Sequence, residues 1–300
     1  MAIALKGDFI GFSFNEHRSE SLGIVRVSDG SRYNEDLVPT TQDKTVQVPG
    51  GDGFYYFGSD YTQRQFSINI AFDELTEKQF RELQQVFGTK ELGKLVFDER
   101  PYKYYMVKSG KPQLKYICFG KEGERIYKGE GTLTFTAYYP FAKSIFKFLN
   151  EYGNKNKDEW KEASGMKAEK GTYDIVSNNG SISVYNAGDL ETDFILKFSL
   201  PVDNTPIGDI KITLSKENAG KVEAFLDLNG FSKKDADTGF QINTKTNLIE
   251  GFNAEGLTGT LYNENITQGD FFKIPPREEG YQISVTGATP IEIVYDYIYY

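Results

Sequence analysis

Alternation between apolar and polar residues, with a period of two, recurs along most of this 300-residue chain. The clearest example runs from Gly131 to Ala142, where Leu133, Phe135 and Ala137 alternate with threonines until Pro140 ends the pattern. Successive side chains of a strand point to opposite faces, so this spacing predicts strands with one buried face. The chain is therefore expected to be mainly β, and its 20 Tyr and 23 Phe suit such half-buried surfaces.

One helix is predicted in the first half, where the apolar spacing changes to three and four. Thr76 and Gln79 have the spacing of a capping box, and Phe80, Leu83 and Phe87 follow as an apolar stripe. Alternating segments precede and follow this helix. Residues 1–142 are thus expected to form the α+β part of the fold, a split-barrel-like β domain with one packed helix.

The composition changes after Pro140, and this change predicts a second domain. Residues 143–170 are expected to form a helical linker, because apolar side chains over residues 141–152 share one helical face and a charged run follows. Residues 171–300 alternate again in short segments separated by turn residues. This pattern is typical of a β-sandwich or jelly roll.

The chain is poor in the residues that catalysis and metal binding need. His17 is the one histidine and Cys118 the one cysteine, so a multi-histidine metal site and a cysteine zinc cage are excluded. The chain has no G-x-S-x-G motif, and nothing near His17 in the sequence supplies a nucleophile or an orienting partner, which argues against a Ser-His-Asp triad. We therefore predict no catalytic residue, no metal ligand and no cofactor, and expect a protein that is not an enzyme. Cys118 lies within an alternating segment and is expected to be an inert core thiol.

Carboxylates leave two alternatives open in the acidic second half. Asp227, Asp235 and Asp237 lie near Phe225 and Phe231 in the sequence. Paired carboxylates in an aromatic cleft are the equipment of a glycosidase, and aromatic platforms beside carboxylates can bind a sugar without cleaving it. No spacing singles out a pair. A jelly-roll protein that binds a cell-wall sugar is the alternative function, and hydrolysis is the weaker one.

The charge distribution argues against nucleic-acid binding. Residues 1–142 have a net charge of −1 and the remaining residues −8, whereas a general nucleic-acid binder is basic. No apolar run reaches the roughly 18 residues that a membrane span needs. The first residues are too weakly apolar for a signal peptide, so folding in a cytoplasm and no membrane partner are expected.

The least regular stretch of the first half covers residues 31–61 and contains the run VPGGDGFYYFG. Its glycines lack the Gly-Lys-Ser/Thr continuation of a phosphate-binding loop. A long hairpin arm with clustered aromatic residues is a natural element for subunit contacts. The predicted contact residues are Val48, Gly53, Phe54, Tyr55, Tyr56 and Phe57, and the predicted interdomain residues are Tyr139, Pro140 and Trp160.

Several motifs in the same order along the chain resemble the distal tail protein (Dit) family of bacteriophages with long, non-contractile tails. The turn Val48–Gly53 is similar to the family's V-P-G-x-D-G turn, and Gly131–Ala142 is similar to the strand that closes its first domain. The other matching segments are Phe9–Phe14, Gly93–Asp98, Tyr104–Val107, Val176–Gly180, Lys221–Leu228 and Gly269–Pro275.

The resemblance implies a virion structural protein at the phage tail tip. The first domain would form a homohexameric ring around a channel through which DNA passes without specific binding. The second domain would be a galectin-like sandwich. The implied neighbours are the tail tube protein and the tail-tip or baseplate hub, and in some members a receptor-binding protein or a host cell-wall sugar.

Overall fold

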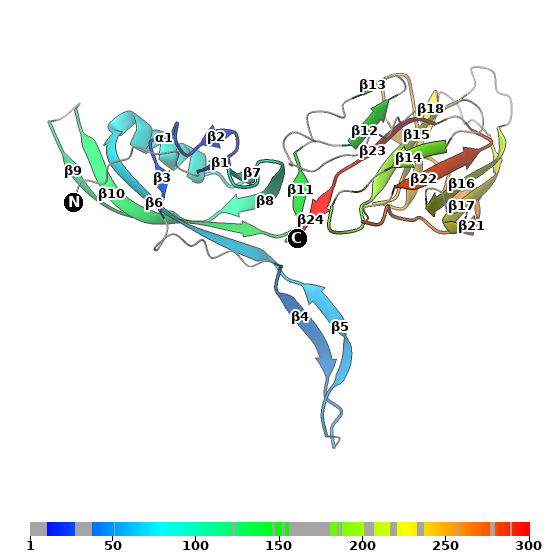
Figure 1. Ribbon diagram of the computed structural model, residues 1–300, viewed down its shortest axis with the longest axis horizontal. Coiled ribbons are helices and arrows are strands. Elements are labelled where there is room, and N and C mark those ends of the chain that lie inside the picture. Colours follow the sequence, from blue (N-terminus) through cyan, green and yellow to red (C-terminus); the bar gives the residue numbers. More distant parts are fainter. Residues whose placement is uncertain are drawn as a thin grey trace. The chain divides into compact units, whose positions relative to one another are not determined.

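The computed structural model divides the chain into two compact units, residues Met1–Lys143 with Tyr300, and residues Ser144–Tyr299. Figure 1 shows the elements of both. The structure describes residues 11–27, 38–50, 52–121, 124–145, 148–151, 154–155, 181–184, 186, 188–200, 207–216, 221–232, 237–256, 258–276, 280–288 and 290–300.

The first unit is antiparallel β structure with a helix inserted after its longest strand. Its strands and helix are β1 (Phe12–Phe14), β2 (His17–Arg18), β3 (Val25–Arg26), β4 (Thr41–Val46), β5 (Tyr55–Tyr61), β6 (Arg64–Thr76), α1 (Glu77–Phe87), β7 (Leu92–Phe97), β8 (Lys103–Ser109), β9 (Gln113–Phe119) and β10 (Ile126–Ala137). A short strand, β11 (Ala142–Ser144), spans the division between the units.

The main sheet of this unit has the order β2-β1-β7-β8-β10-β6-β3, and β9 pairs with β10. Its centre is the long antiparallel pair β6 and β10, in which Phe135 lies opposite Phe66 and Leu133 opposite Ile68. All four side chains are buried. The alternation that predicted these strands is thus the alternation between their core face and their outer face.

Helix α1 covers the core face of the β6–β10 pair. Thr76 accepts a hydrogen bond from the Gln79 backbone, and the Gln79 side chain accepts one from the Thr76 backbone, which confirms the predicted capping box. Phe80, Leu83 and Phe87 are buried. The Phe87 ring lies 6.1 Å from that of Phe135. The apolar stripe of the helix therefore faces the core, as the helical spacing predicted.

The second unit contains two antiparallel sheets. Its elements are β12 (Phe148–Glu151), β13 (Asn154–Lys155), β14 (Ser181–Val184), β15 (Phe194–Ser199), β16 (Gly208–Lys216), β17 (Val222–Phe231), β18 (Gly239–Asn243), β19 (Leu248–Phe252), β20 (Thr258–Leu261), the 3-10 turn η1 (Asn263–Asn265), β21 (Ile266–Gly269), β22 (Tyr281–Thr286), β23 (Pro290–Tyr295) and β24 (Ile298–Tyr299).

These two sheets pack face to face as a β-sandwich. One has the order β13-β12-β23-β15-β18-β19-β20, and the other β14-β22-β16-β17-β21. Phe231 of β17 and Phe240 of β18 are fully buried, and their ring centroids are 4.4 Å apart, so side chains of the two sheets meet in one core. The predicted fold class, mainly β with an α+β first half, is confirmed.

The helix predicted over residues 141–152 is wrong. Residues of this stretch form β11 and β12, and β12 pairs with β23 so that Leu149 lies opposite Val294. Pairing with a strand far along the chain outweighs the local helical pattern, because propensity is only a weak preference. The rest of the predicted linker, apart from Asn154–Lys155, lies outside the described residues.

Within the part of the chain that the structure describes, no helix is long and apolar enough to cross a membrane.

Candidate functional site: an exposed aromatic arm

Strands β4 and β5 form a two-stranded sheet of their own, and together with the turn between them they are called the arm. The arm projects away from the main sheet of the first unit (Figure 1). All six residues of β4 are exposed, and so are all residues of β5 except Gly58, which is half-buried. A two-stranded hairpin is marginally stable alone, so the arm needs support at its base or from a partner.

A β-bulge decides which aromatic side chains of the arm share a face. Asp43 lies opposite Ser59, but Thr45 lies opposite Tyr56, so β5 carries one residue more than β4 between these pairs. Gly58 lies in this bulge with φ of +100°, a conformation that favours glycine. The extra residue shifts the alternation of β5 by one.

On the tip side of the bulge, Val46 lies opposite Tyr55, and Phe57 follows two residues after Tyr55, so these three side chains share one face of the arm, here called the apolar arm face. The bulge moves Tyr61 to the opposite face. Tyr55 is 64% exposed and Phe57 67% exposed. Near the tip, Phe54 is as exposed as Phe57, and Val48 is also exposed. Single exposed apolar residues are ordinary, but a contiguous group of this kind marks an interaction surface.

The opposite face of the arm is polar and internally hydrogen-bonded. The hydroxyls of Tyr56 and Ser59 are 2.6 Å apart, and Ser59 donates to the Asp43 carboxylate at 2.5 Å. These bonds satisfy the polar groups of this face from within the arm. The two faces therefore differ, and the apolar arm face is the one suited to a partner.

Aromatic rings hold the base of the arm on the first unit. The Tyr61 ring lies 4.9 Å from Phe141 and 6.4 Å from Tyr300. The backbone carbonyl of Tyr300 accepts hydrogen bonds from the Lys103 ammonium at 3.1 Å and the Tyr105 hydroxyl at 3.4 Å. Because Lys103 and Tyr105 are buried, this cluster anchors Tyr300, and with it the arm base, to the core.

The structure places all six predicted contact residues in the arm: Val48, Gly53, Phe54, Tyr55, Tyr56 and Phe57. Gly53 lies in the turn between β4 and β5 with φ of +94°. Whether these residues contact a subunit stays a prediction. The sequence reasoning missed Val46 and Tyr61. Alternation within residues 41–46 was the signal for Val46, whereas only the fold brings Tyr61 to Tyr300.

The predicted interdomain residues are partly described. Tyr139 is exposed and its ring lies 5.4 Å from Phe141, while Pro140 is buried within the first unit. Trp160 lies outside the described residues. An interdomain role for these three residues stays a prediction.

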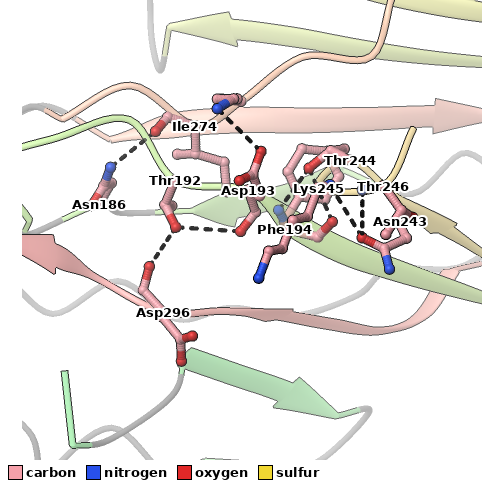
Figure 2. Close-up of polar contacts among 11 residues, drawn as sticks. Asn186, Thr192, Asp193, Phe194, Asn243, Thr244, Lys245, Thr246, Ile274 and Asp296 are labelled. Carbon is pink, nitrogen blue, oxygen red and sulfur yellow. Dashed lines mark hydrogen bonds and ion pairs between the residues drawn. The ribbon is translucent and has the colours of Figure 1, made fainter. Parts of the chain in front are cut away.

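A polar cluster in the second unit, shown in Figure 2, ties chain segments together. The Asn186 amide donates to the Ile274 carbonyl at 2.9 Å, and the Thr192 hydroxyl donates to the Asp296 carbonyl at 2.5 Å. Lys273 and the Asp193 carboxylate form an ion pair at 3.5 Å. Most of the acceptors are backbone carbonyls, so the cluster completes the hydrogen bonding of buried loops and offers no reactive group.

The two described carboxylates considered for sugar chemistry, Asp227 and Asp237, are engaged within the sandwich. The Tyr262 hydroxyl donates to the buried Asp237 carboxylate at 2.7 Å. Phe231 is fully buried and stacks on Tyr262, so it offers no surface to a sugar ring. Asp227 pairs with Lys211 at 3.3 Å, and Asp235 lies outside the described residues. Among the described residues, no group of three His, Cys, Asp or Glu could hold a metal ion.

Comparison with known proteins gives this arrangement a context. Residues 23–137, which include the arm and helix α1, match the family model described as the phage tail protein RIFT-related domain. The first half of the chain thus resembles a phage tail protein domain. No curated protein matches the sequence.

Solved structures extend the likeness over the whole chain. The crystal structure of the Dit protein of phage SPP1, described as a paradigm of the hub adsorption apparatus in phages that infect Gram-positive bacteria, aligns with a TM-score of 0.59 at 12% identity, covering 98% of this chain and 100% of that one. A chain of the phage P2 baseplate in its activated conformation aligns with a TM-score of 0.45 at 11% identity, covering 96% and 97%. The likeness to the SPP1 protein shows a Dit-like fold, and the resemblance to Dit proteins is confirmed.

Proposed function

We propose that this siphophage tail protein is a distal tail protein that forms a homohexameric ring at the end of the tail tube. In this role it joins the tube to the tail-tip or baseplate hub and leaves a channel for DNA. It acts through assembly alone and not through catalysis. It is assembled in the host cytoplasm and becomes part of the virion.

The observation that carries the proposal is the arm. A closed ring is built from head-to-tail contacts, in which one surface of each copy meets a different surface of the next. The apolar arm face extends Val46, Tyr55 and Phe57 away from their own unit, where a second copy can cover them. A buried Phe or Tyr side chain contributes about 1.5–3 kcal/mol, so a few such anchors repeated around a ring suffice for closure.

The charge of the first unit suits a DNA channel. Residues 1–142 have a net charge of −1. A strongly basic lumen would hold the phosphate backbone and slow its passage, whereas a nearly neutral domain exerts little attraction. The alternative is recognition of a cell-wall sugar by the sandwich. Phe231 and Asp237, which were candidates for that role, are buried in the core.

Native mass spectrometry of the full chain tests the proposal, alone and co-expressed with the hub protein of the same phage. We expect six-membered rings for the unmodified chain in at least one condition. The double variant Tyr55→Ser with Phe57→Ser is expected to stay monomeric. Leu261→Ser is the control, because it removes an exposed apolar side chain from the second unit, and it should leave the rings intact.

A chain that stays monomeric in both conditions would overturn the hexamer. Rings that survive the loss of Tyr55 and Phe57 would show that the arm does not close them.

A further inference from the structure

A ring of identical copies needs a second surface that receives the arm, and this inference rests on the proposed function. Apart from the residues at the base of the arm, two groups of exposed apolar residues stand out among the described residues of the first unit. One is the arm, and the other lies on β9, where Tyr116, Ile117 and Phe119 are exposed.

The exposure of β9 corrects a prediction from the sequence. Its alternation suggested a half-buried strand with Cys118 in the core, but Cys118 is exposed. Apart from the half-buried Leu114, every residue of β9 is exposed. Within the described residues, β9 pairs only with β10, so it is an edge strand of its sheet. An exposed apolar edge strand invites association with another chain.

The two faces of the β9–β10 pair have different neighbours. On one face, the Tyr116 ring lies 5.1 Å from Phe80 of helix α1, and the Tyr127 ring stacks on Phe80 at 4.4 Å. The helix therefore covers this face. The register places Ile117 opposite Lys128 and Phe119 opposite Ile126 on the other face, away from the helix.

This second face is called the β9 surface. Ile117 is 65% exposed and Phe119 is also exposed. Lys115 lies on the same face of β9, opposite Glu130, and Lys128 pairs with Asp73. The β9 surface is thus an apolar patch bordered by charged groups, which is the composition of an interface with a polar rim.

The chain segments that contain the two surfaces have opposite net charges. Residues 111–131, which contain β9 and the start of β10, have a net charge of +2 in a chain whose total is −9. Residues 38–61, which contain the arm, have a net charge of −2. Opposite charges steer association and disfavour the wrong register, in which two arms or two β9 surfaces would meet.

We propose that the β9 surface of one copy receives the apolar arm face of the neighbouring copy. Tyr55 and Phe57 then pack on Ile117 and Phe119, and the acidic arm lies beside the basic segment around β9. The contact is head-to-tail, because the arm and the β9 surface are different surfaces of one chain, and repetition around an axis closes a ring. It also covers the edge strand, which removes the hazard of uncontrolled pairing.

Cysteine cross-linking of the full chain tests the proposal. In a Cys118→Ser background, one variant carries Tyr55→Cys with Ile117→Cys, and the matched control carries Tyr55→Cys with Leu92→Cys. Leu92 is an exposed apolar residue of β7 in the same unit. After mild oxidation, with the hub co-expressed if rings require it, we expect a disulfide-linked ladder that ends at six copies for the first variant and at least tenfold less product for the control.

Mixing two single-cysteine variants, one with Tyr55→Cys and the other with Ile117→Cys, shows whether the link joins different copies. A covalent dimer is expected from the mixture, and little from either variant alone. If rings of normal mass form with no more cross-linking than in the Leu92 control, the β9 surface does not receive the arm, and the proposed function stands. A chain that forms no ring in any condition would instead remove the proposed function.

The double variant Ile117→Ser with Phe119→Ser supplies a second measurement. Both residues are exposed, so the fold should persist, which a thermal melt will show. We expect the concentration needed for half-assembly to rise about 30-fold, as for the loss of a central interface anchor. DNA is the alternative ligand of a basic surface. The double variant Lys115→Glu with Lys128→Glu tests this alternative. If that variant retains DNA less strongly while the Ile117 and Phe119 variant assembles normally, the proposal is wrong.

Discussion

The arm and the β6–β10 pair show how differently the same kind of strand can be used. Both are antiparallel pairs in the first unit, and both are rich in Phe and Tyr. In the β6–β10 pair, Phe66 and Phe135 lie opposite each other, and both side chains are at least 93% buried on the core face of the sheet. In the arm, Tyr55 and Phe57 lie next to each other on one face and remain about two-thirds exposed.

The comparison teaches that aromatic content identifies a strand without saying what covers it. A core face is covered by the same chain, and its side chains contribute to the stability of the monomer. An arm face is covered by another chain, and its side chains contribute to assembly. The two roles separate when stability and assembly are measured on the same variants.

The largest effect is expected from matched truncations of one aromatic residue in each region. Phe135→Ala removes a ring that contacts Phe12, Phe14 and Phe87, and should lower the free energy of unfolding by about 3–5 kcal/mol. Phe57→Ala should change it by less than about 0.5 kcal/mol, because the residue is exposed in the monomer. Urea denaturation of the monomeric chain measures both. Equal losses would remove the distinction between core and arm.

A smaller effect is expected at the junction between the two regions. Tyr61→Ala removes the ring that packs against Phe141 and Tyr300 at the base of the arm. Aromatic pairs of this kind contribute about 0.5–1.5 kcal/mol. Hydrogen exchange of the β5 backbone should become faster by up to about tenfold, while β6 and β10 keep their protection. Tyr56→Ala is the control, because Tyr56 lies on the polar face away from the base. Unchanged exchange in the Tyr61 variant would show that the rings do not anchor the arm.

The smallest effect is expected from the loss of one hydrogen bond that joins helix α1 to β10. The Tyr127 hydroxyl donates to the Glu77 carboxylate. This bond lowers the pKa of Glu77, aided by Arg81, and raises the pKa of Tyr127 to about 12. Each group is held in the protonation state that maintains the bond.

The sign of each shift sets the pH window in which the bond stabilises the fold. The contribution of Glu77 is present above pH 4.5 and is lost as the pH falls through its lowered pKa. The contribution of Tyr127 is complete below pH 10 and is lost as the pH rises through about 12. Thermal melts from pH 3 to pH 8 should therefore show the unmodified chain more stable than Tyr127→Phe at neutral pH, with the difference shrinking toward pH 3. If the stability difference between the two chains does not change with pH, it arises from packing and not from this hydrogen bond.

Much of the fold could be predicted because its determinants are local. The capping box at Thr76 and Gln79 and the stripe of Phe80, Leu83 and Phe87 specify a helix within about one dozen residues. The alternation around Leu133 and Phe135 specifies a strand in the same way. The aromatic arm was visible as a run of four aromatic residues after a glycine-rich turn.

The errors arose where a distant partner decides the outcome. Residues 148–151 have a helical pattern but pair with β23, almost 150 residues further along the chain. Cys118 has the alternating neighbours of a core residue, yet it is exposed on a strand that pairs, within the described part of the chain, with β10 alone. Tyr61 lies on the face opposite to Tyr55 and Phe57 because of a bulge at Gly58, since one extra residue exchanges the two faces of a strand.

The sequence by itself determined that this chain is mainly β, where the capped helix α1 begins, and that its first half contains an aromatic arm. These properties depend on side-chain spacing over a few residues, which alternation and capping express directly. Only the tertiary structure decided that residues 148–151 form a strand, that Tyr300 returns to the base of the arm, and that β9 is an exposed edge strand among the described residues. Burial depends on what packs above a residue, and that neighbour is chosen by the whole chain.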